Sequence, residues 1–124
     1  MSGFLPSLFS DKNGGAVIFR EIFFKSPVGM CVLTHPDFEI KLVNDSFAKV
    51  FSLDKSKITG ELFAVVWEKS KARDDFFTGL IKKGYVDNFM LLREISGGDK
   101  REIMLSAVFI DSDDILITAA IRPD

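Results

Sequence analysis

Few residues of this chain could take part in covalent or metal chemistry. The 124 residues include one histidine, His35, and one cysteine, Cys31. A nucleophilic pair needs the thiol and the imidazole to meet in space, and a strand residue followed by a turn residue is poorly placed for that. A zinc site would have to depend on carboxylates, which is uncommon. The sequence therefore predicts no catalytic residues, no metal site and no enzyme.

A second candidate for chemistry is the acidic segment 111–114, which reads Asp-Ser-Asp-Asp. Closely spaced carboxylates can bind calcium, but the helix–loop–helix calcium site uses a twelve-residue loop with a central glycine and a terminal glutamate. This segment has neither feature. We interpret it as a solvated turn between two strands.

The composition indicates a folded domain with an unusually apolar interior. Hydrophobic residues make up 47% of the chain and charged residues 27%, and 13 of the aromatic residues are phenylalanine, against one Trp and one Tyr. These proportions are typical of a single globular domain. Because Phe needs no hydrogen-bond partner, it can either fill a core or line a pocket for an apolar ligand. Both interpretations stay open at this point.

Charge, cysteine content and hydropathy limit the expected partners and location. The formal net charge is −2 and the basic residues are dispersed, so nucleic acid is not an expected partner. A single cysteine cannot form an internal disulfide, which suits a reducing compartment. The sequence shows no signal peptide and no stretch long enough to span a membrane. We therefore expect a cytoplasmic domain.

Periodicity and turn residues predict an α+β domain. Residues 1–15 are interpreted as an N-terminal extension or linker, and residues 16–124 as the domain. Helices are expected over 16–25, after Asn44 or Asp45, over 61–68 as a helix or turn, and over 74–83. Strands are expected over 28–34, 39–43, 86–96, 101–110 and 115–121. This order predicts one five-stranded antiparallel sheet with short helices packed on one face and an N-terminal helix.

The last strands carry apolar residues on both faces. In 101–110, Ile103 and Leu105 alternate with Met104 and further apolar residues, whereas a half-solvated antiparallel sheet should alternate apolar with polar. Something apolar is therefore expected to cover the second face. The candidates are the helix 16–25, the segment 4–9 and a partner subunit.

Short sequence patterns follow one another in a specific order along residues 19–122. They are Phe19–Phe23 with Ser26–Met30, Thr34–Ile40 with Val43–Phe47, Ile58–Glu61, and then Leu80, Gly84, Val86, Asn88–Phe89, Arg93, Gly98 and Leu105–Ala107. Together they resemble the PAS family of sensory domains. His35 and Phe38 stand where the family often has aspartate and glycine. The end, Ile121–Asp124, resembles the family's terminal Asp-Ile-Thr motif only loosely.

The resemblance implies a sensory or regulatory module of a signal-transduction protein, such as a two-component system. Such a module binds a small apolar ligand, or relays a signal by homodimerisation, to an output domain outside this chain. Histidine kinases and cyclic-dinucleotide enzymes are the output domains that the resemblance suggests. The alternative is a protein-interaction or dimerisation module without a ligand.

The resemblance also allows two cofactors to be considered. Haem-binding relatives use a helix histidine as the iron ligand, and none of the predicted helices contains a histidine. Photoactive flavin relatives carry a cysteine in an Asn-Cys-Arg helix motif, whereas Cys31 lies in the first predicted strand. Haem and photoactive flavin are therefore disfavoured, and the cofactor stays unknown.

Strand parity and the predicted helix faces give candidate site residues. The small residues Ala107 and Ala119 either leave room for a ligand or accommodate the Phe rings, and both alternatives remain open. The side chains expected to line a pocket between helices and sheet are Val32, Leu42, Phe47, Phe51, Phe63, Trp67, Phe77, Phe89, Leu91, Leu105, Ala107, Ile117 and Ala119. Those expected at a dimer interface are Phe19, Ile22, Phe23 and Leu116.

Overall fold

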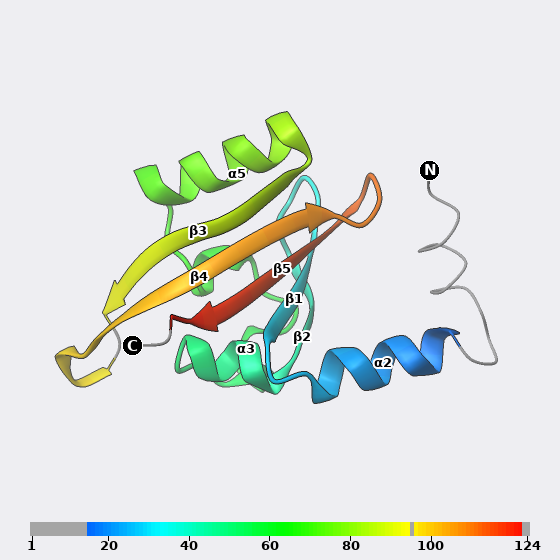
Figure 1. Ribbon diagram of the computed structural model, residues 1–124, viewed down its shortest axis with the longest axis horizontal. Coiled ribbons are helices and arrows are strands. Elements are labelled where there is room, and N and C mark those ends of the chain that lie inside the picture. Colours follow the sequence, from blue (N-terminus) through cyan, green and yellow to red (C-terminus); the bar gives the residue numbers. More distant parts are fainter. Residues whose placement is uncertain (1–14, 95, 123–124) are drawn as a thin grey trace.

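Five strands form one antiparallel sheet in the order β2-β1-β5-β4-β3 (Figure 1). The computed structural model describes residues 15–94 and 96–122. The strands are β1 (Gly29–Thr34), β2 (Ile40–Val43), β3 (Tyr85–Glu94), β4 (Lys100–Phe109) and β5 (Asp114–Ile121). The first and last strands pair at the centre of the sheet, because β1 hydrogen-bonds to β5. The predicted five-stranded antiparallel sheet is confirmed.

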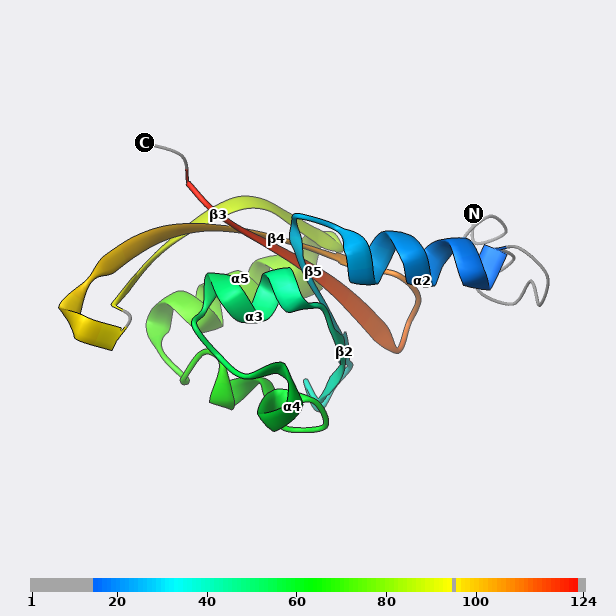
Figure 2. The ribbon, with the colours of Figure 1, turned by 90° about the horizontal axis from the view of Figure 1, so that it is seen from below.

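The helices between β2 and β3 cover one face of this sheet. They are α3 (Asp45–Val50), α4 (Lys55–Ile58), the 3-10 turn η1 (Phe63–Val65) and α5 (Lys71–Lys83), and a second 3-10 turn, η2 (Ser96–Gly98), joins β3 to β4. Figure 2 shows α3, α4 and α5 on the same side of the sheet, while α2 (Gly15–Lys25) extends beyond its edge. No helix of the described residues is long and apolar enough to cross a membrane.

Capping side chains set where the short helices begin. Asp54 accepts a hydrogen bond from the backbone N–H of Ser56, and Ser70 accepts one from that of Arg73. These bonds satisfy backbone amides that a helix start would leave free. They also explain two differences from the predicted elements. The polar segment 54–59, where no helix was predicted, contains α4, and α5 begins three residues earlier than predicted.

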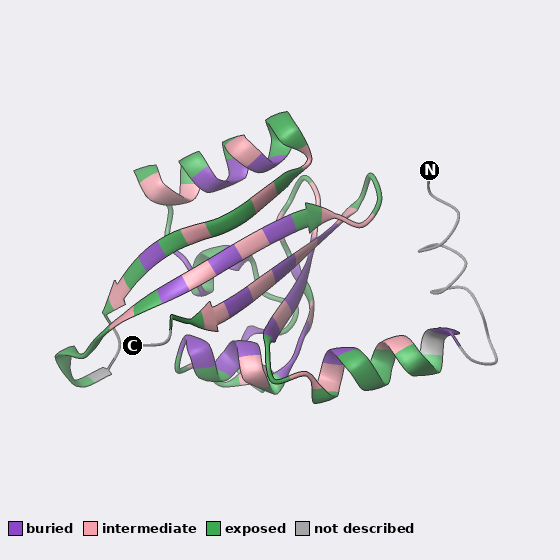
Figure 3. Ribbon diagram, in the orientation of Figure 1, coloured by how far each residue is buried: buried purple, intermediate pink, exposed green. Residues whose placement is uncertain are grey.

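The hydrophobic core lies between the helices and the sheet, and along β4 and β5 the core-facing residues alternate with less buried ones (Figure 3). Close approach at Gly29 helps α3 to pack on this face. A Cβ atom at Gly29 would lie 2.8 Å from the Ala119 carbonyl oxygen and 2.8 Å from the Phe47 Cα. Glycine at this position therefore allows α3 to contact β1 and β5 directly.

The opposite face of the sheet, here called the outer face, is apolar and partly exposed. Tyr85 on β3 is 50% exposed and Val108 on β4 is 44% exposed. On α2, Val17, Ile18 and Ile22 are also exposed, so within the described residues the helix 16–25 leaves much of this face open. The segment 4–9, the second candidate cover, lies outside the described residues.

Candidate functional site

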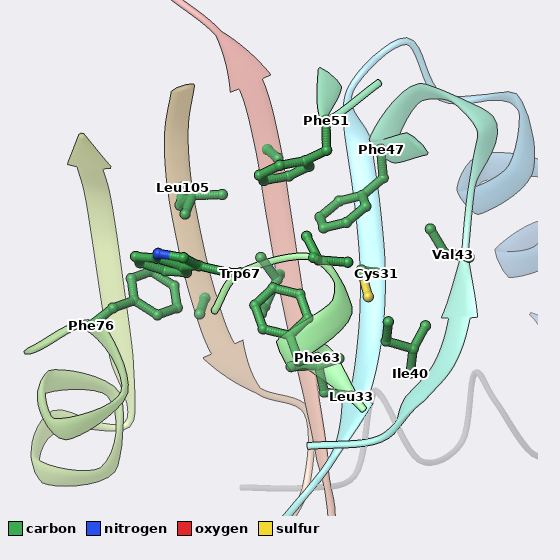
Figure 4. Close-up of a cluster of buried hydrophobic side chains, with 14 of the residues drawn as sticks. Cys31, Leu33, Ile40, Val43, Phe47, Phe51, Phe63, Trp67, Phe76 and Leu105 are labelled. Atoms are coloured by element: carbon green, nitrogen blue, oxygen red, sulfur yellow. The ribbon is translucent and has the colours of Figure 1, made fainter. Parts of the chain in front are cut away.

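A connected group of aromatic rings occupies the space between the helices and the sheet (Figure 4). Trp67 lies 5.5 Å from Phe76 and 6.0 Å from Phe89 between ring centroids. Phe76 contacts Phe77 edge-on at 5.2 Å, and Phe77 contacts Phe63 edge-on at 5.9 Å. Such edge-to-face contacts are favourable for aromatic rings. The rings therefore pack directly against one another.

Most of the predicted pocket residues converge on this ring group. Their side chains are buried in the core cluster, or in the case of Phe89 packed against it: Phe47, Phe51, Phe63, Trp67, Phe77, Phe89, Leu91, Leu105, Ala107, Ile117 and Ala119. The structure thus brings together the residues that strand parity and helix periodicity had grouped. A binding role for these residues stays a prediction.

Val32 and Leu42 do not face the core, contrary to the prediction. They pair with each other across β1 and β2 and line a groove with Phe19 of α2. Their neighbours Cys31, Leu33, Ile40 and Val43 face the ring group instead. The residues from Met30 to Leu33 are all apolar, so parity could not distinguish the two faces, and a register shift between Val32 and Leu33 breaks the alternation between β1 and β2.

Four hollows among the described residues open at the surface. Two of them lie on the outer face, one lies beside α3 and one lies beside α5. The largest of the side chains that are fully buried in the core include Phe47, Phe63 and Phe76. Phenylalanine volume therefore fills the region where an internal ligand would sit.

Cys31 and His35 have separate environments. Cys31 lies on β1 inside the core, and burial raises the pKa of its thiol, which keeps the sulfur protonated and unreactive. His35 lies in the turn after β1 with its ring edge-on to Phe109 at 5.1 Å, and its buried Nδ1 has no hydrogen-bond partner in the described structure. Among residues 15–94 and 96–122, no group of three His, Cys, Asp or Glu side chains is arranged to hold a metal ion.

Asn44 connects three elements through its side chain. Its Oδ1 accepts hydrogen bonds from the backbone N–H groups of Met30 and Phe47, both at 2.9 Å. Its Nδ2 donates to the carbonyl oxygens of Phe23 at 2.7 Å and Val28 at 3.1 Å. Asn44 is the one buried polar residue of the described core, and all four of its hydrogen-bonding positions are used. Sequence reasoning identified Asn44 as a possible helix cap but missed its attachment to the end of α2.

The four predicted interface residues differ in their exposure. Ile22 is 57% exposed, Leu116 is half-buried on the outer face, and Phe19 lines the groove beside β2. Phe23 is fully buried, so its prediction as a surface residue was wrong. Its ring packs against Phe19 and Phe24, and its backbone carbonyl accepts a hydrogen bond from Asn44.

Comparison with solved structures identifies this arrangement. The chain superimposes on the PAS domain of a LuxR-family transcriptional regulator from Burkholderia thailandensis, solved in complex with ethanol, with a TM-score of 0.64, 17% identity and coverage of 83% of this chain and 96% of that one. The PAS domain of an HTR-like protein from Haloarcula marismortui gives a TM-score of 0.61, 20% identity and coverage of 86% and 96%. A LOV protein from Rhodobacter sphaeroides gives a TM-score of 0.67 and 16% identity, with coverage of 84% of this chain and 65% of that one.

These likenesses define the PAS fold for this chain. The resemblance first seen in short sequence patterns is therefore confirmed at the level of the fold. No family profile and no curated protein matches the sequence.

Proposed function

We propose that this chain is a regulatory sensory module that relays a signal through association of two copies across the outer face and α2. The observation that carries this proposal is an apolar row that crosses all five strands. In the register of the sheet, the row consists of Tyr85, Val108, Leu116, Val32 and Leu42.

The exposure of this row supports a role in association. An antiparallel sheet with one solvated face normally presents polar side chains there. Here Tyr85 and Val108 are about half exposed. The α2 residues Val17, Ile18 and Ile22 add further exposed apolar surface. Contiguous apolar surface of this type is typical of protein interaction sites. Val32 is already buried at 4% exposure, so a second copy would remove mainly Tyr85, Val108 and the α2 residues from water.

The connection through Asn44 supports a relay between α2 and the core. A change in the direction of α2 would break or strain the bond from Asn44 to the Phe23 carbonyl, and Asn44 also caps α3. The neighbours include PAS domains of a transcriptional regulator and of a two-component sensor histidine kinase. By analogy, the output domain here would be a kinase, a cyclic-dinucleotide enzyme or another regulator in the cytoplasm, outside these residues.

Sedimentation equilibrium of the purified chain tests the association. We expect a concentration-dependent dimer, and we expect Val108→Glu to raise its dissociation constant at least tenfold by placing a charge in the interface. The matched control is Val65→Glu, because Val65 has almost the same exposure, 45% against 44%, but lies in η1 on the helical side. A monomeric wild-type chain at about 100 μM, or equal effects of the two substitutions, would refute the proposal.

A second candidate function is binding of a small apolar ligand within the ring group. It is favoured by Ala107 and Ala119, two small residues that face the core from adjacent central strands. The side chains around them would have to rearrange to admit a ligand. Absorbance and mass spectrometry of a denatured extract test this function. A stoichiometric small molecule in the extract would support ligand binding. An extract without one would contradict ligand binding and leave association as the proposed function.

A further inference from the structure

A groove of about 480 Å³ lies on the helical side of the molecule, away from the outer face. We call it the α5 groove. Its lining combines apolar, basic and other polar side chains from the turn before β2, from α5 and from the loop just before α5: Phe38, Phe77, Ile81, Lys69, Arg73, Asp74 and Thr78. Nothing in the association proposed above uses this surface.

The floor of the α5 groove is a stacked aromatic pair. The rings of Phe38 and Phe77 lie 4.3 Å apart at an interplanar angle of 24°, and Ile81 beside them is 56% exposed. The Arg73 guanidinium carbon lies 5.6 Å from the centre of the Phe77 ring. Phe77 itself is only 6% exposed, so the accessible apolar surface of the groove comes from Phe38 and Ile81, with the Arg73 cation beside it.

The backbone of Phe38 is in an unfavourable conformation. Its φ angle is +57°, in the left-handed region that bulky side chains rarely adopt. Hydrogen bonds fix this geometry, because the Phe38 N–H donates to the Thr34 carbonyl at 2.9 Å and the Phe63 N–H donates to the Phe38 carbonyl at 2.8 Å. Strained residues held in this way are concentrated at ligand-binding and other functional positions. The strain places the Phe38 ring over Phe77, where part of it stays accessible.

Positive charge is available at the rim. Lys71 pairs with Asp75 at 2.9 Å, whereas Lys69 and Arg73 have no carboxylate within 4.0 Å among the described residues. Arg73 lies in the first turn of α5, where the helix dipole adds partial positive charge, and Lys69 lies just before the N-cap Ser70. The lining contains a single carboxylate, that of Asp74. The local charge of the groove is therefore complementary to an acidic ligand, although the whole chain is slightly acidic.

We propose that the α5 groove binds an acidic segment of a partner protein, with one apolar side chain placed against Phe38 and Ile81 and carboxylates beside Lys69 and Arg73. The two sides of the sheet then serve different partners. The outer face meets a second copy, and the α5 groove meets a different protein.

Selection from a displayed library of random twelve-residue peptides tests this inference. We expect enrichment of acidic peptides that share an aromatic or large aliphatic residue. Synthetic versions should lose at least tenfold in affinity, by fluorescence polarisation, for the charge-reversed variant Lys69→Glu/Arg73→Glu. The matched control, Lys82→Glu/Lys83→Glu, reverses two charges at the other end of the same helix and should change affinity less than twofold.

A second variant tests the aromatic floor. Phe38→Gly removes the stacked ring and relieves the left-handed backbone, so the protein should stay folded by circular dichroism while peptide affinity falls at least tenfold. The inference is overturned if no peptide is enriched, if the enriched peptides are not acidic, or if the control and charge-reversed variants bind alike. Undiminished binding by Phe38→Gly would also overturn it.

Discussion

Replacing Asn44 with aspartate would separate its two structural roles. A carboxylate oxygen can still accept from the N–H groups of Met30 and Phe47, so the cap of α3 should persist. The substitution removes the two donated bonds and points an oxygen at the carbonyls of Phe23 and Val28. Asn44→Asp should therefore detach the end of α2 while leaving the start of α3 in place.

The size of the effect follows from those two lost bonds. A buried carbonyl that loses its donor costs about 1–3 kcal/mol, so the two together should lower the free energy of unfolding by about 2–6 kcal/mol. With a urea dependence of about 2 kcal/mol per molar for a domain of this size, the midpoint should fall by about 1–3 M. The matched control is Ser46→Ala, which removes a single bond from the Ser46 hydroxyl to the Ser26 carbonyl. It should cost about 1 kcal/mol.

Urea unfolding followed by circular dichroism gives the global effect, and native-state hydrogen exchange locates it. Amides in the last turn of α2 should exchange much faster in Asn44→Asp, whereas the Phe47 amide should keep most of its protection. The reasoning is refuted if the urea midpoint of Asn44→Asp equals that of the wild type. It is also refuted if protection is lost at Phe47 before it is lost in α2.

Three further substitutions or measurements test the core. Gly29→Ala should lower the free energy of unfolding by about 2–3 kcal/mol, because the new Cβ would lie 2.8 Å from atoms of Ala119 and Phe47; an unchanged melting temperature would contradict the close packing of α3. Ala107→Leu should cost about 1–3 kcal/mol if the ring group fills its space, and a neutral or stabilising effect would instead indicate room for a ligand. Cys31 should resist a thiol reagent at neutral pH until the chain unfolds, because burial raises its pKa; rapid labelling of the folded protein would disprove this protection.

The order of the elements and their packing faces were predictable to different degrees. Turn residues and capping signals gave the order of strands and helices, because these depend on local chemistry such as Gly84 ending α5. The faces of β4 and β5 were also predictable, since Ile103, Leu105 and Ile117 occupy one parity. The faces of β1 were not predictable, because its residues are apolar on both faces and the register shifts between Val32 and Leu33.

The outward connections of the domain were the least predictable feature. The side chain of Asn44 reaches the Phe23 carbonyl across 21 positions of the sequence, and nothing local to Asn44 indicates that partner. In the same way, the row on the outer face depends on strand register, which aligns Val108 with Leu116 and Leu116 with Val32. The pairing of β1 with β5 joins strands that lie far apart in the sequence and share no turn, so single-sequence patterns do not specify it.

The single Trp and the single Tyr of this chain lie on opposite sides of the sheet. Trp67 is buried among the rings of the core, whereas Tyr85 is half exposed at the end of the outer-face row. The indole emission maximum therefore reports on polarity inside the fold, and the near-ultraviolet derivative spectrum of the phenol reports on hydration outside it. A ligand bound in the core would shift the Trp67 emission maximum, and association of two sheets would shift the Tyr85 derivative spectrum. Unmodified protein thus carries two intrinsic optical probes that can tell an internal event from a surface event without any label.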